Sequence, residues 1–321
     1  MTDIKKIGVV GCGFVGSTIA YTLMESEMFN EMALIDVNES KARGEALDLG
    51  HCLPFLSPMQ IYQSTYSGLE NASIVVVAAG VNQKEGETRI DLLNRNVKIF
   101  SDIIRRITEV NKECIILVVT NPVDILTYVT LKLSNFSPNR VIGSGTVLDT
   151  ARLKYLVGNR LDVDARNVHS FIIGEHGDSE LAVWSSANVS GIDIQEYCAI
   201  SGTERSMSEL YGLFDYVKNS AYEIIRDKGA TYYAIAQSAK RIIKSIVSDE
   251  KSILPVTTYL DGHYGLDDIC LSVPAVIGRN GVEHVLDIPL NEDESRRLQL
   301  SAKTICEYID TLDIRSGSMV K

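Results

Sequence analysis

The sequence predicts an α/β protein in which a Rossmann-type, doubly wound parallel sheet is followed by an α+β domain with antiparallel strands. Apolar, strand-like runs alternate with helical patterns up to residue 144, which is the order of a parallel sheet covered by helices on both faces. Beyond residue 145, two long helical patterns precede strands joined by short turns at Asp261-Gly262 and Asn280-Gly281. We expect a first domain at residues 1–144 and a second at residues 145–321.

The composition is ordinary for a soluble globular protein. The 321 residues are 45% hydrophobic and 23% charged, enough for two domains with sizeable cores. A formal net charge of −11 argues against nucleic acid or an anionic membrane as a partner. There is no apolar signal segment, no run as long as the roughly 20 residues of a membrane span, and no C-x-x-C pair among the six cysteines. These features predict a cytoplasmic protein with reduced thiols and no metal site.

The elements of the first domain are predicted from its apolar runs. Residues 73–79 are valine-rich, which is typical of a parallel strand buried on both faces. The expected strands are residues 7–10, 32–35, a short one near Ile61, 73–79, 114–119 and 141–144. The expected helices are residues 17–24, 39–49, 89–111 and one with Pro122 at its first position.

A glycine-rich turn joins the first strand to the first helix. Gly11, Gly13 and Gly16 form the pattern G-x-G-x-x-G, whose glycines permit a tight turn, close approach to a pyrophosphate and close packing of helix on strand. The N-terminus of the helix then presents free backbone N–H groups, near Phe14 and Val15, to the phosphates. The turn therefore predicts a dinucleotide site.

Asp36 ends the second strand, 20 residues after Gly16, where a carboxylate binds the adenosine ribose hydroxyls. A carboxylate here repels a 2′-phosphate, so the sequence favours NAD over NADP. The other expected cofactor contacts are Lys41, whose alternative is a solvated helix residue, Tyr66 at the adenine, and Gly80-Val81 after the strand at residues 73–79.

Polar side chains follow two of the parallel strands. Residues 82–88 are polar and contain a glycine, so we expect a mobile loop there. Arg89, which opens the next helix, is either a surface residue or a cation that this loop carries into a site when it closes. Asn121 follows the strand at residues 114–119, and its amide can bond a nicotinamide or substrate oxygen.

A histidine lies in the turn at residues 174–178, directly after the apolar run at residues 171–173. The pattern puts the His176 imidazole at a strand end, in the open, where it can transfer protons near neutral pH. Asp149 and Arg152 are three residues apart on an expected helix at residues 149–157, so they share one face. Taken singly, the histidine is usually a solvated turn residue and the acid–arginine pair a surface ion pair; the catalytic interpretation depends on finding all three in one chain.

The rest of the second domain is predicted from its periodicity. Residues 203–226 and 231–248 have helical patterns, residues 181–194 have strand character, and residues 253–288 are expected to form the antiparallel strands. Asn291 and Glu294 give the last helix a start that resembles a capping box. Its apolar stripe consists of Leu298, Ala302, Ile305, Ile309 and Leu312.

Five of these motifs together resemble the lactate/malate dehydrogenase family over nearly the whole chain. They are the glycine turn with Asp36 and the segments at residues 79–89, 120–124, 143–152 and 174–178. The resemblance implies reversible hydride transfer between NADH and a small 2-keto acid.

The resemblance also implies a role for each polar residue of the site. His176 is expected to give its proton to the keto oxygen as hydride arrives from NADH, and Asp149 to stabilise the imidazolium. Arg152 is expected to hold the substrate carboxylate with two parallel hydrogen bonds, and Arg89 to polarise the carbonyl when its loop closes. Two further polar residues complete the pocket, Asn121 and Thr231.

Within this resemblance, the identity of residue 83, Gln83, indicates which of two substrates to expect. Malate dehydrogenases of the family place an arginine here, which pairs the second carboxylate of oxaloacetate. Gln83 is neutral, so we expect pyruvate and L-lactate, at the end of fermentative glycolysis, with malate dehydrogenase as the alternative. A non-catalytic NAD-binding module is the other alternative, and oxidation of NADH by pyruvate distinguishes it from an enzyme.

The resemblance further implies a homotetramer and an allosteric effector. Bacterial members bind fructose 1,6-bisphosphate between subunits through an arginine and a histidine, and the matching positions here hold Lys154 and His169. Lysine keeps the positive charge but loses the planar grip on phosphate. An effector site and two solvated residues are therefore both open interpretations.

Overall fold

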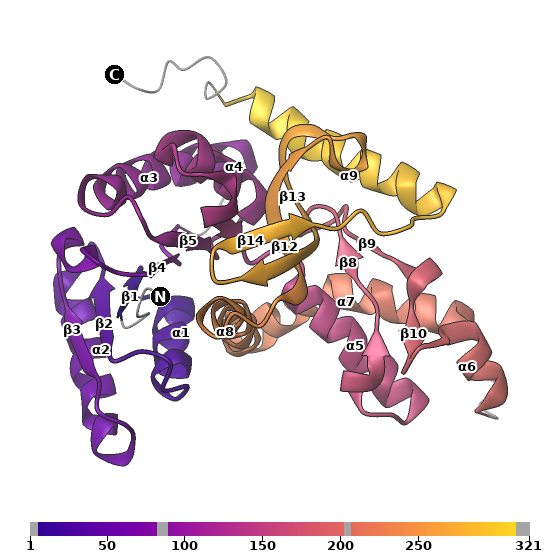
Figure 1. Ribbon diagram of the computed structural model, residues 1–321, viewed down its shortest axis with the longest axis horizontal. Helices are drawn as coiled ribbons and strands as arrows, with labels where there is room; N and C mark the ends of the chain where they lie inside the picture. Colours follow the sequence, from indigo (N-terminus) through magenta and orange to yellow (C-terminus); the bar gives the residue numbers. More distant parts are fainter. Residues whose placement is uncertain (1–5, 82–88, 202–206, 313–321) are drawn as a thin grey trace.

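The computed structural model describes residues 6–81, 89–201 and 207–312, apart from the side chain of Arg89. Gln83 and the Arg89 side chain thus lie outside the described residues. Within the described ranges, nine strands form one sheet in the order β3-β2-β1-β4-β5-β6-β12-β13-β14 (Figure 1). The first six of these are parallel and the last three antiparallel, which confirms the predicted α/β fold.

The parallel part of the sheet follows the expected alternation of strand and helix. Its strands are β1 (Lys6–Val10), β2 (Glu31–Ile35), β3 (Gln60–Gln63), β4 (Ile74–Val77), β5 (Ile115–Val118) and β6 (Val141–Gly143). The helices are α1 (Phe14–Met24), α2 (Glu39–Cys52), α3 (Arg89–Val110) and α4 (Val123–Ser134), with 3-10 turns at Leu53–Phe55, Tyr66–Leu69 and Pro138–Arg140. Pro122 precedes α4 as its N-cap residue, so the prediction that it is the first helical residue is wrong by one position.

The antiparallel strands extend the parallel sheet across residue 144. These strands are β12 (Ser252–Asp261), β13 (Asp267–Gly278) and β14 (Gly281–Val285), with a 3-10 turn at His263–Gly265. Thr257 of β12 pairs with Gly143 of β6, which joins the last strand of the predicted first domain to the second. Both predicted turn dipeptides lie between these strands, at Asp261-Gly262 and Asn280-Gly281.

The remaining elements also follow residue 144 in the chain, and α5, α6 and α7 lie on the side of the hairpin away from α1 and α2 (Figure 1). The helices are α5 (Val147–Leu161), α6 (Ile194–Ile200), α7 (Met207–Lys228), α8 (Tyr233–Val247) and α9 (Glu292–Asp310). Short strands are β7 (Val168–His169), β8 (Ile172–Ile173), β9 (Leu181–Ala182), β10 (Asn188–Val189) and β11 (Ile192–Asp193), with 3-10 turns at Ala165–Asn167 and Trp184–Ser186. Residues 181–194, for which strand character was expected, thus form short strands separated by a 3-10 turn, and their last residue begins α6. Helix α6 follows because the Asp193 side chain accepts hydrogen bonds from the backbone N–H groups of Gln195 and Glu196.

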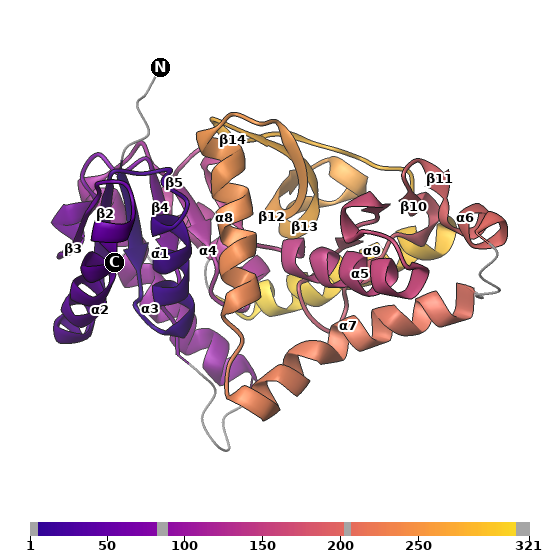
Figure 2. The ribbon, with the colours of Figure 1, turned by 90° about the horizontal axis from the view of Figure 1, so that it is seen from below.

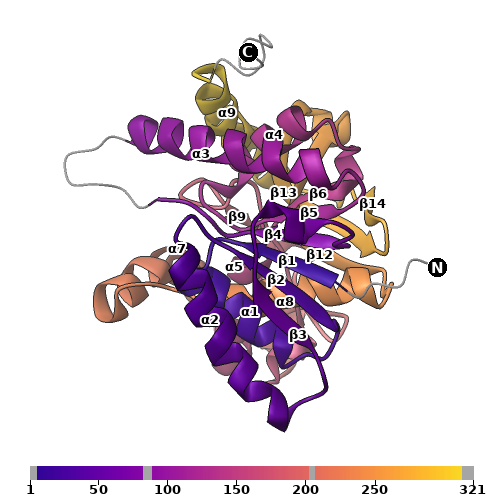
Figure 3. The same cartoon turned by 90° about the vertical axis from the view of Figure 1, so that its left-hand side faces the viewer.

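Each face of the sheet has its own core. Helices α3, α4 and α9 cover one face, and α1, α2 and α8 cover the other (Figure 3). A third core lies between α5, α6 and α7, with Val157, Ile194 and Phe214 among its buried residues. Figure 2 shows α8 between α1 and α5, both of which it contacts, so this helix ties the two halves of the chain together.

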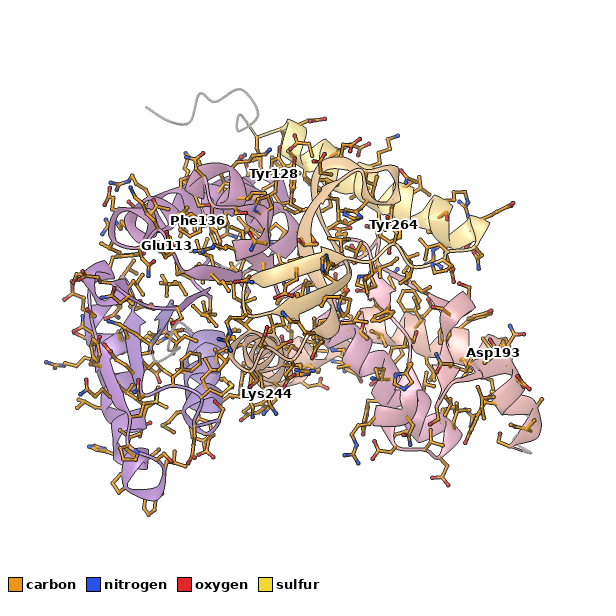
Figure 4. All side chains as sticks on the ribbon, in the orientation of Figure 1. Glu113, Tyr128, Phe136, Asp193, Lys244 and Tyr264 are labelled. Atoms are coloured by element: carbon orange, nitrogen blue, oxygen red, sulfur yellow. The ribbon has the colours of Figure 1, made fainter. Side chains whose placement is uncertain are left out.

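Helix α9 closes over the hairpin of β12 and β13. Its N-terminus has the predicted capping box, in which Asn291 and Glu294 each accept a hydrogen bond from the other's backbone N–H. The predicted apolar stripe is buried. Tyr264, labelled beside α9 in Figure 4, links the hairpin to this helix because its carbonyl accepts a hydrogen bond of 2.9 Å from Gln299.

None of the six cysteines, all of which lie in the described ranges, is in a disulfide, and Cys12, Cys114, Cys198 and Cys270 are buried. Over the described ranges, no helix is both long enough and apolar enough to cross a membrane.

Candidate active site

The glycine turn between β1 and α1 has no room for side chains at two of its three glycines. Gly11 has a φ of +97°, and a Cβ there would lie 2.5 Å from the backbone nitrogen of Ala79. A Cβ on Gly16 would lie 1.8 Å from the carbonyl oxygen of Gly11. Gly13 faces open space, with nothing within 4 Å of an added Cβ. Helix α1 begins at Phe14, so its N-terminal N–H groups, including that of Val15, lie at this open position.

Asp36 is attached to this turn. Its carboxylate accepts hydrogen bonds from the backbone N–H groups of Cys12 (2.7 Å) and Asn38 (2.8 Å). Burial raises the pKa of Tyr66 to about 12, opposed by Arg106, and the charges of Asp102 and Asp36 contribute to the rise. Lys41 is exposed on the first turn of α2. The structure therefore attaches Asp36 to the glycine turn and leaves Lys41 in solvent.

The carboxyl ends of β4 and β5 lie side by side, because these strands are parallel neighbours. The backbone N–H of Val81 donates to Asn96 on α3 (3.0 Å), and the hydroxyl of Thr120 donates to the carbonyl of Ala79 (2.8 Å). Gly80 and Asn121 are exposed at this edge. The predicted cofactor and pocket residues on both strands thus share one edge of the sheet.

Asp149 lies between a histidine and an arginine. Its Oδ2 is 2.6 Å from Nδ1 of His176, and its Oδ1 accepts a 2.9 Å hydrogen bond from Nη1 of Arg152. The side chain of Asp149 is 4% exposed, that of Arg152 15% and that of His176 23%. The expectation that His176 stands in the open is therefore wrong: its ring is largely enclosed, with Asp149 on the inner side.

The charges of these three residues support one another. Burial works to lower the pKa of His176, but the charge and hydrogen bond of Asp149, with smaller contributions from the charges of Glu180 and Asp124, outweigh burial and raise the pKa to about 9. Burial likewise works to raise the pKa of Asp149, but His176 and Arg152 outweigh it and hold the pKa below its ordinary value. At neutral pH the site therefore holds an imidazolium, a carboxylate and a guanidinium.

Helix α5 is bonded to the strand that precedes His176. The hydroxyl of Thr146 donates to the carbonyl of Ile172, and the backbone N–H of Ile172 donates to the hydroxyl of Thr150 (2.9 Å). These bonds fix Asp149, on the first turn of α5, relative to β8 and the turn that carries His176.

Asp124 is a site residue to which the sequence analysis gave no role. Its Oδ2 accepts a 2.8 Å hydrogen bond from the backbone N–H of His176, and its Oδ1 accepts bonds from Thr257 (2.7 Å) and Ser272 (3.2 Å). Burial raises the pKa of Asp124 to about 6. The only signal was its place in the motif at residues 120–124. It anchors the histidine turn to β12 and β13.

The segment with Thr231 contacts the glycine turn. Phe14 is 70% exposed and its ring stacks on Tyr232, with 5.5 Å between the ring centroids. The Nζ of Lys228 also lies over the ring of Tyr232, 3.6 Å from its centroid. Thr231, directly before Tyr232, is thereby held next to the predicted cofactor site.

The two predicted effector residues lie on neighbouring elements. Lys154 is half-buried on α5, and His169 is exposed on β7, which packs against α5. Burial alone lowers the pKa of Lys154, so no carboxylate of the described residues supports its charge.

One sizeable cavity lies away from this site. This cavity of about 710 Å³, lined by Glu113 and Phe136 (labelled in Figure 4), opens between α3 and α4 at the amino ends of the parallel strands. Ligands of doubly wound sheets bind at the opposite, carboxyl ends, where Asp36, Asn121 and the glycine turn lie.

Asp149 and His176, with Glu180, also bring one ligand atom each within 4.8 Å of one another. Asp149 already pairs with two cations, the guanidinium of Arg152 and protonated His176. Its two oxygens are therefore engaged in ion pairs.

Comparisons with known proteins agree with this geometry. A family model described as lactate/malate dehydrogenase, NAD binding domain, matches residues 5–143, and one described as lactate/malate dehydrogenase, alpha/beta C-terminal domain, matches residues 146–313. The L-lactate dehydrogenase of Acetivibrio thermocellus is 55% identical, over 97% of this chain and 98% of its own. L-lactate dehydrogenase 1 of Clostridium acetobutylicum is 47% identical, over 97% of this chain and all (100%) of its own.

Solved structures are similar over the same length. The minor L-lactate dehydrogenase of Enterococcus mundtii, in a ligands-bound form, has a TM-score of 0.92 at 41% identity and covers 96% of this chain and 98% of its own. A lactate dehydrogenase from a Medee basin deep-sea metagenome library has a TM-score of 0.94 at 42% identity and covers 98% of this chain and 100% of its own.

The raised pKa of His176 predicts how its contribution to stability depends on pH. Because the pKa rises from 6.5 to about 9 on folding, the contribution is fully present below pH 6.5 and is lost as pH rises through 9. His176→Asn should therefore lower the free energy of unfolding by on the order of 3 kcal/mol more at pH 6 than at pH 10. Urea unfolding of both proteins at the two pH values measures this. A difference that stays constant or grows with pH would contradict the imidazolium–carboxylate pair.

Proposed function

The chain belongs to the lactate/malate dehydrogenase family and catalyses the NAD-dependent interconversion of pyruvate and L-lactate, and we propose that His176, Asp149 and Arg152 carry the reaction. The observation that supports these roles is the position of Asp149, bonded at once to the proton-carrying ring and to the guanidinium.

His176 acts as the proton donor in pyruvate reduction. Its Nδ1 faces Asp149, which leaves Nε2 for the keto oxygen of pyruvate. With a pKa of about 9, the ring is protonated at neutral pH and gives its proton to that oxygen. Bound NADH supplies the hydride. In lactate oxidation the neutral ring takes the proton back, and Asp149 stabilises the imidazolium that forms.

Arg152 binds the substrate carboxylate. One of its five N–H donors is used on Asp149. The others are available to the carboxylate of pyruvate, in the bidentate arrangement that a lysine cannot reproduce. Because Asp149 orients both side chains, it sets the position of the carboxylate relative to the proton donor.

The remaining predicted residues surround this centre. We propose that residues 1–144 hold NAD, with the glycine turn at the pyrophosphate, Asp36 at the adenosine ribose, and Tyr66 and Gly80-Val81 along the cofactor. Residues 145–321 supply the proton donor and the carboxylate clasp, while Asn121 and Thr231 complete the pocket. Arg89, opening α3 directly after residues 82–88, polarises the carbonyl.

Removal of the proton donor tests the mechanism. His176→Ala should reduce kcat for pyruvate by roughly 10²–10⁴-fold, the usual contribution of a positioned general acid. The Kd for NADH should stay within about twofold, because Asp36 and the glycine turn are untouched. His51→Ala, which removes an exposed histidine of α2, is the matched control. Near-normal turnover of the His176 variant would overturn the assignment.

Gln83 is proposed to set the preference for pyruvate, since a neutral side chain leaves no buried charge beside the methyl group of pyruvate. Gln83→Arg should raise the ratio of kcat/KM for oxaloacetate to that for pyruvate by at least about tenfold, because the new cation pairs the second carboxylate. Gln83→Leu, which is neutral and of similar size, should leave oxaloacetate a poor substrate. An unchanged ratio in the arginine variant would show that selectivity lies elsewhere.

The quaternary and regulatory properties are further proposals. We propose a cytoplasmic homotetramer in which Lys154 and His169 of two subunits bind fructose 1,6-bisphosphate. The observation that supports the effector site is that Lys154 on α5 and the exposed His169 on β7 belong to elements that pack against each other. Without effector, the cations of two subunits repel each other across a twofold axis, and a bisphosphate neutralises them.

This effector site predicts activation by a bisphosphate. Millimolar fructose 1,6-bisphosphate should lower KM for pyruvate, because it neutralises the cations that face each other across the twofold axis. His169→Ala should abolish the activation, whereas His284→Ala, at an exposed position on β14, should keep it. Pyruvate saturation curves that coincide with and without effector would refute the site.

A further inference from the structure

We propose that Glu180 is a positioning residue whose buried carboxyl group controls the charge of His176 and so sets the alkaline limit of pyruvate reduction. The proposal rests on His176 being the proton donor. It adds a second carboxyl group to the pair formed by His176 and Asp149.

Glu180 is buried without the bonds that a buried carboxyl group needs. It lies between the histidine turn and β9, is 4% exposed, and its Oε1 has no hydrogen-bond partner among the described residues. One oxygen of Glu180, one of Asp149 and a ring nitrogen of His176 all lie within 4.8 Å of one another. An unpartnered buried polar atom destabilises a fold. The stability of the fold therefore does not explain why Glu180 is buried here. We attribute its burial to an effect on the neighbouring Asp149 and His176.

The charged groups around Glu180 come from three elements. Asp149 and Arg152 face it from α5, Lys218 from α7, and His176 from the turn. On the other side of the ring, Asp124 of α4 acts on His176, and Glu175 of the turn acts on Asp124. Burial raises the pKa of Glu180 to about 8, and Asp149 adds to the rise while the three cations oppose it.

The two carboxyl groups beside His176 thus have opposite states at neutral pH. Asp149 is ionised because two cations hold its pKa low, whereas Glu180 keeps its proton. Neighbouring carboxyl groups whose pKa values are driven apart by their surroundings take different roles in acid–base chemistry. Asp149 supplies a permanent charge to the imidazolium, and Glu180 supplies a charge that depends on pH.

This second charge extends the working range of the proton donor. As pH rises through 8, Glu180 ionises, and its negative charge favours the protonated ring, so His176 keeps its proton to a higher pH. When His176 gives its proton to the keto oxygen, the cation that opposed the burial of an ionised Glu180 disappears. Glu180 then takes up a proton from solvent and returns to its neutral form, so that two uncompensated carboxylates do not face a neutral ring.

Glu180→Gln tests the proposal because it keeps the shape of the side chain and removes its titration. The readout is kcat/KM for pyruvate at saturating NADH from pH 6 to pH 10.5. The midpoint of its alkaline limb should move to lower pH by on the order of one unit, which is a tenfold loss of proton affinity. The Kd for NADH and the rate at pH 6 should stay near those of the wild type.

Asp178→Asn is the matched control. Asp178 is two residues from both His176 and Glu180 and is exposed, so water screens its charge and its loss should leave the alkaline limb in place. A limb that is unmoved in Glu180→Gln, or moved equally in Asp178→Asn, would overturn the proposal. If Glu180→Gln does not fold, Glu180→Asp carries the same test, because its shorter side chain withdraws the charge from the ring and should give a smaller shift in the same direction; an unmoved limb again overturns it.

The result for the Glu180 variants can be distinguished from the result that tests the proposed function. Failure of the Glu180 proposal leaves the loss of turnover in His176→Ala intact. If His176→Ala keeps turnover, the proton donor itself is misassigned, whatever the profile of the Glu180 variants.

Discussion

The buried carboxylate of Asp149 is the constraint on which the site depends. A charge with 4% of its side chain exposed persists only when it is paired, and here one oxygen binds His176 and the other Arg152. Each pairing also serves chemistry, since one raises the proton affinity of the ring and the other aligns the guanidinium. Because the burial of Asp149 requires both cations, Asp149 fixes the distance between the proposed proton donor, His176, and the proposed carboxylate-binding residue, Arg152.

The fold keeps this arrangement in place through elements that are distant in the chain. Thr146 and Thr150 bond α5 to β8, and Asp124 of α4 holds the backbone of His176 to the antiparallel strands. Those strands in turn continue the parallel sheet through Thr257 and Gly143. The cofactor edge of the sheet and the catalytic turn are therefore parts of one hydrogen-bonded framework, which explains how residues 52 positions apart in sequence can meet within hydrogen-bonding distance.

Most of the fold was predictable from local patterns in the sequence. The parallel strands and their helices were predictable because buried parallel strands are short apolar runs. The glycine turn was predictable because its pattern is one that the backbone requires: Gly11 and Gly16 have no space for a Cβ. The errors lie where local signals compete: residues 181–194 were expected as strand, but the Asp193 side chain caps a helix from Ile194. Pro122 is outside α4 by one residue, within the usual uncertainty of a helix boundary.

The sequence by itself determined which residues are candidates for function, because the glycine turn with Asp36, and His176 with Asp149 and Arg152, form recognisable motifs in one chain. Only the tertiary structure decided how those residues are arranged. It enclosed a ring that was expected in the open, gave Asp124 its place behind the histidine turn, and buried Glu180 beside the ring. Burial and pairing depend on groups that the chain brings together from distant positions, and no local pattern records what will cover a side chain.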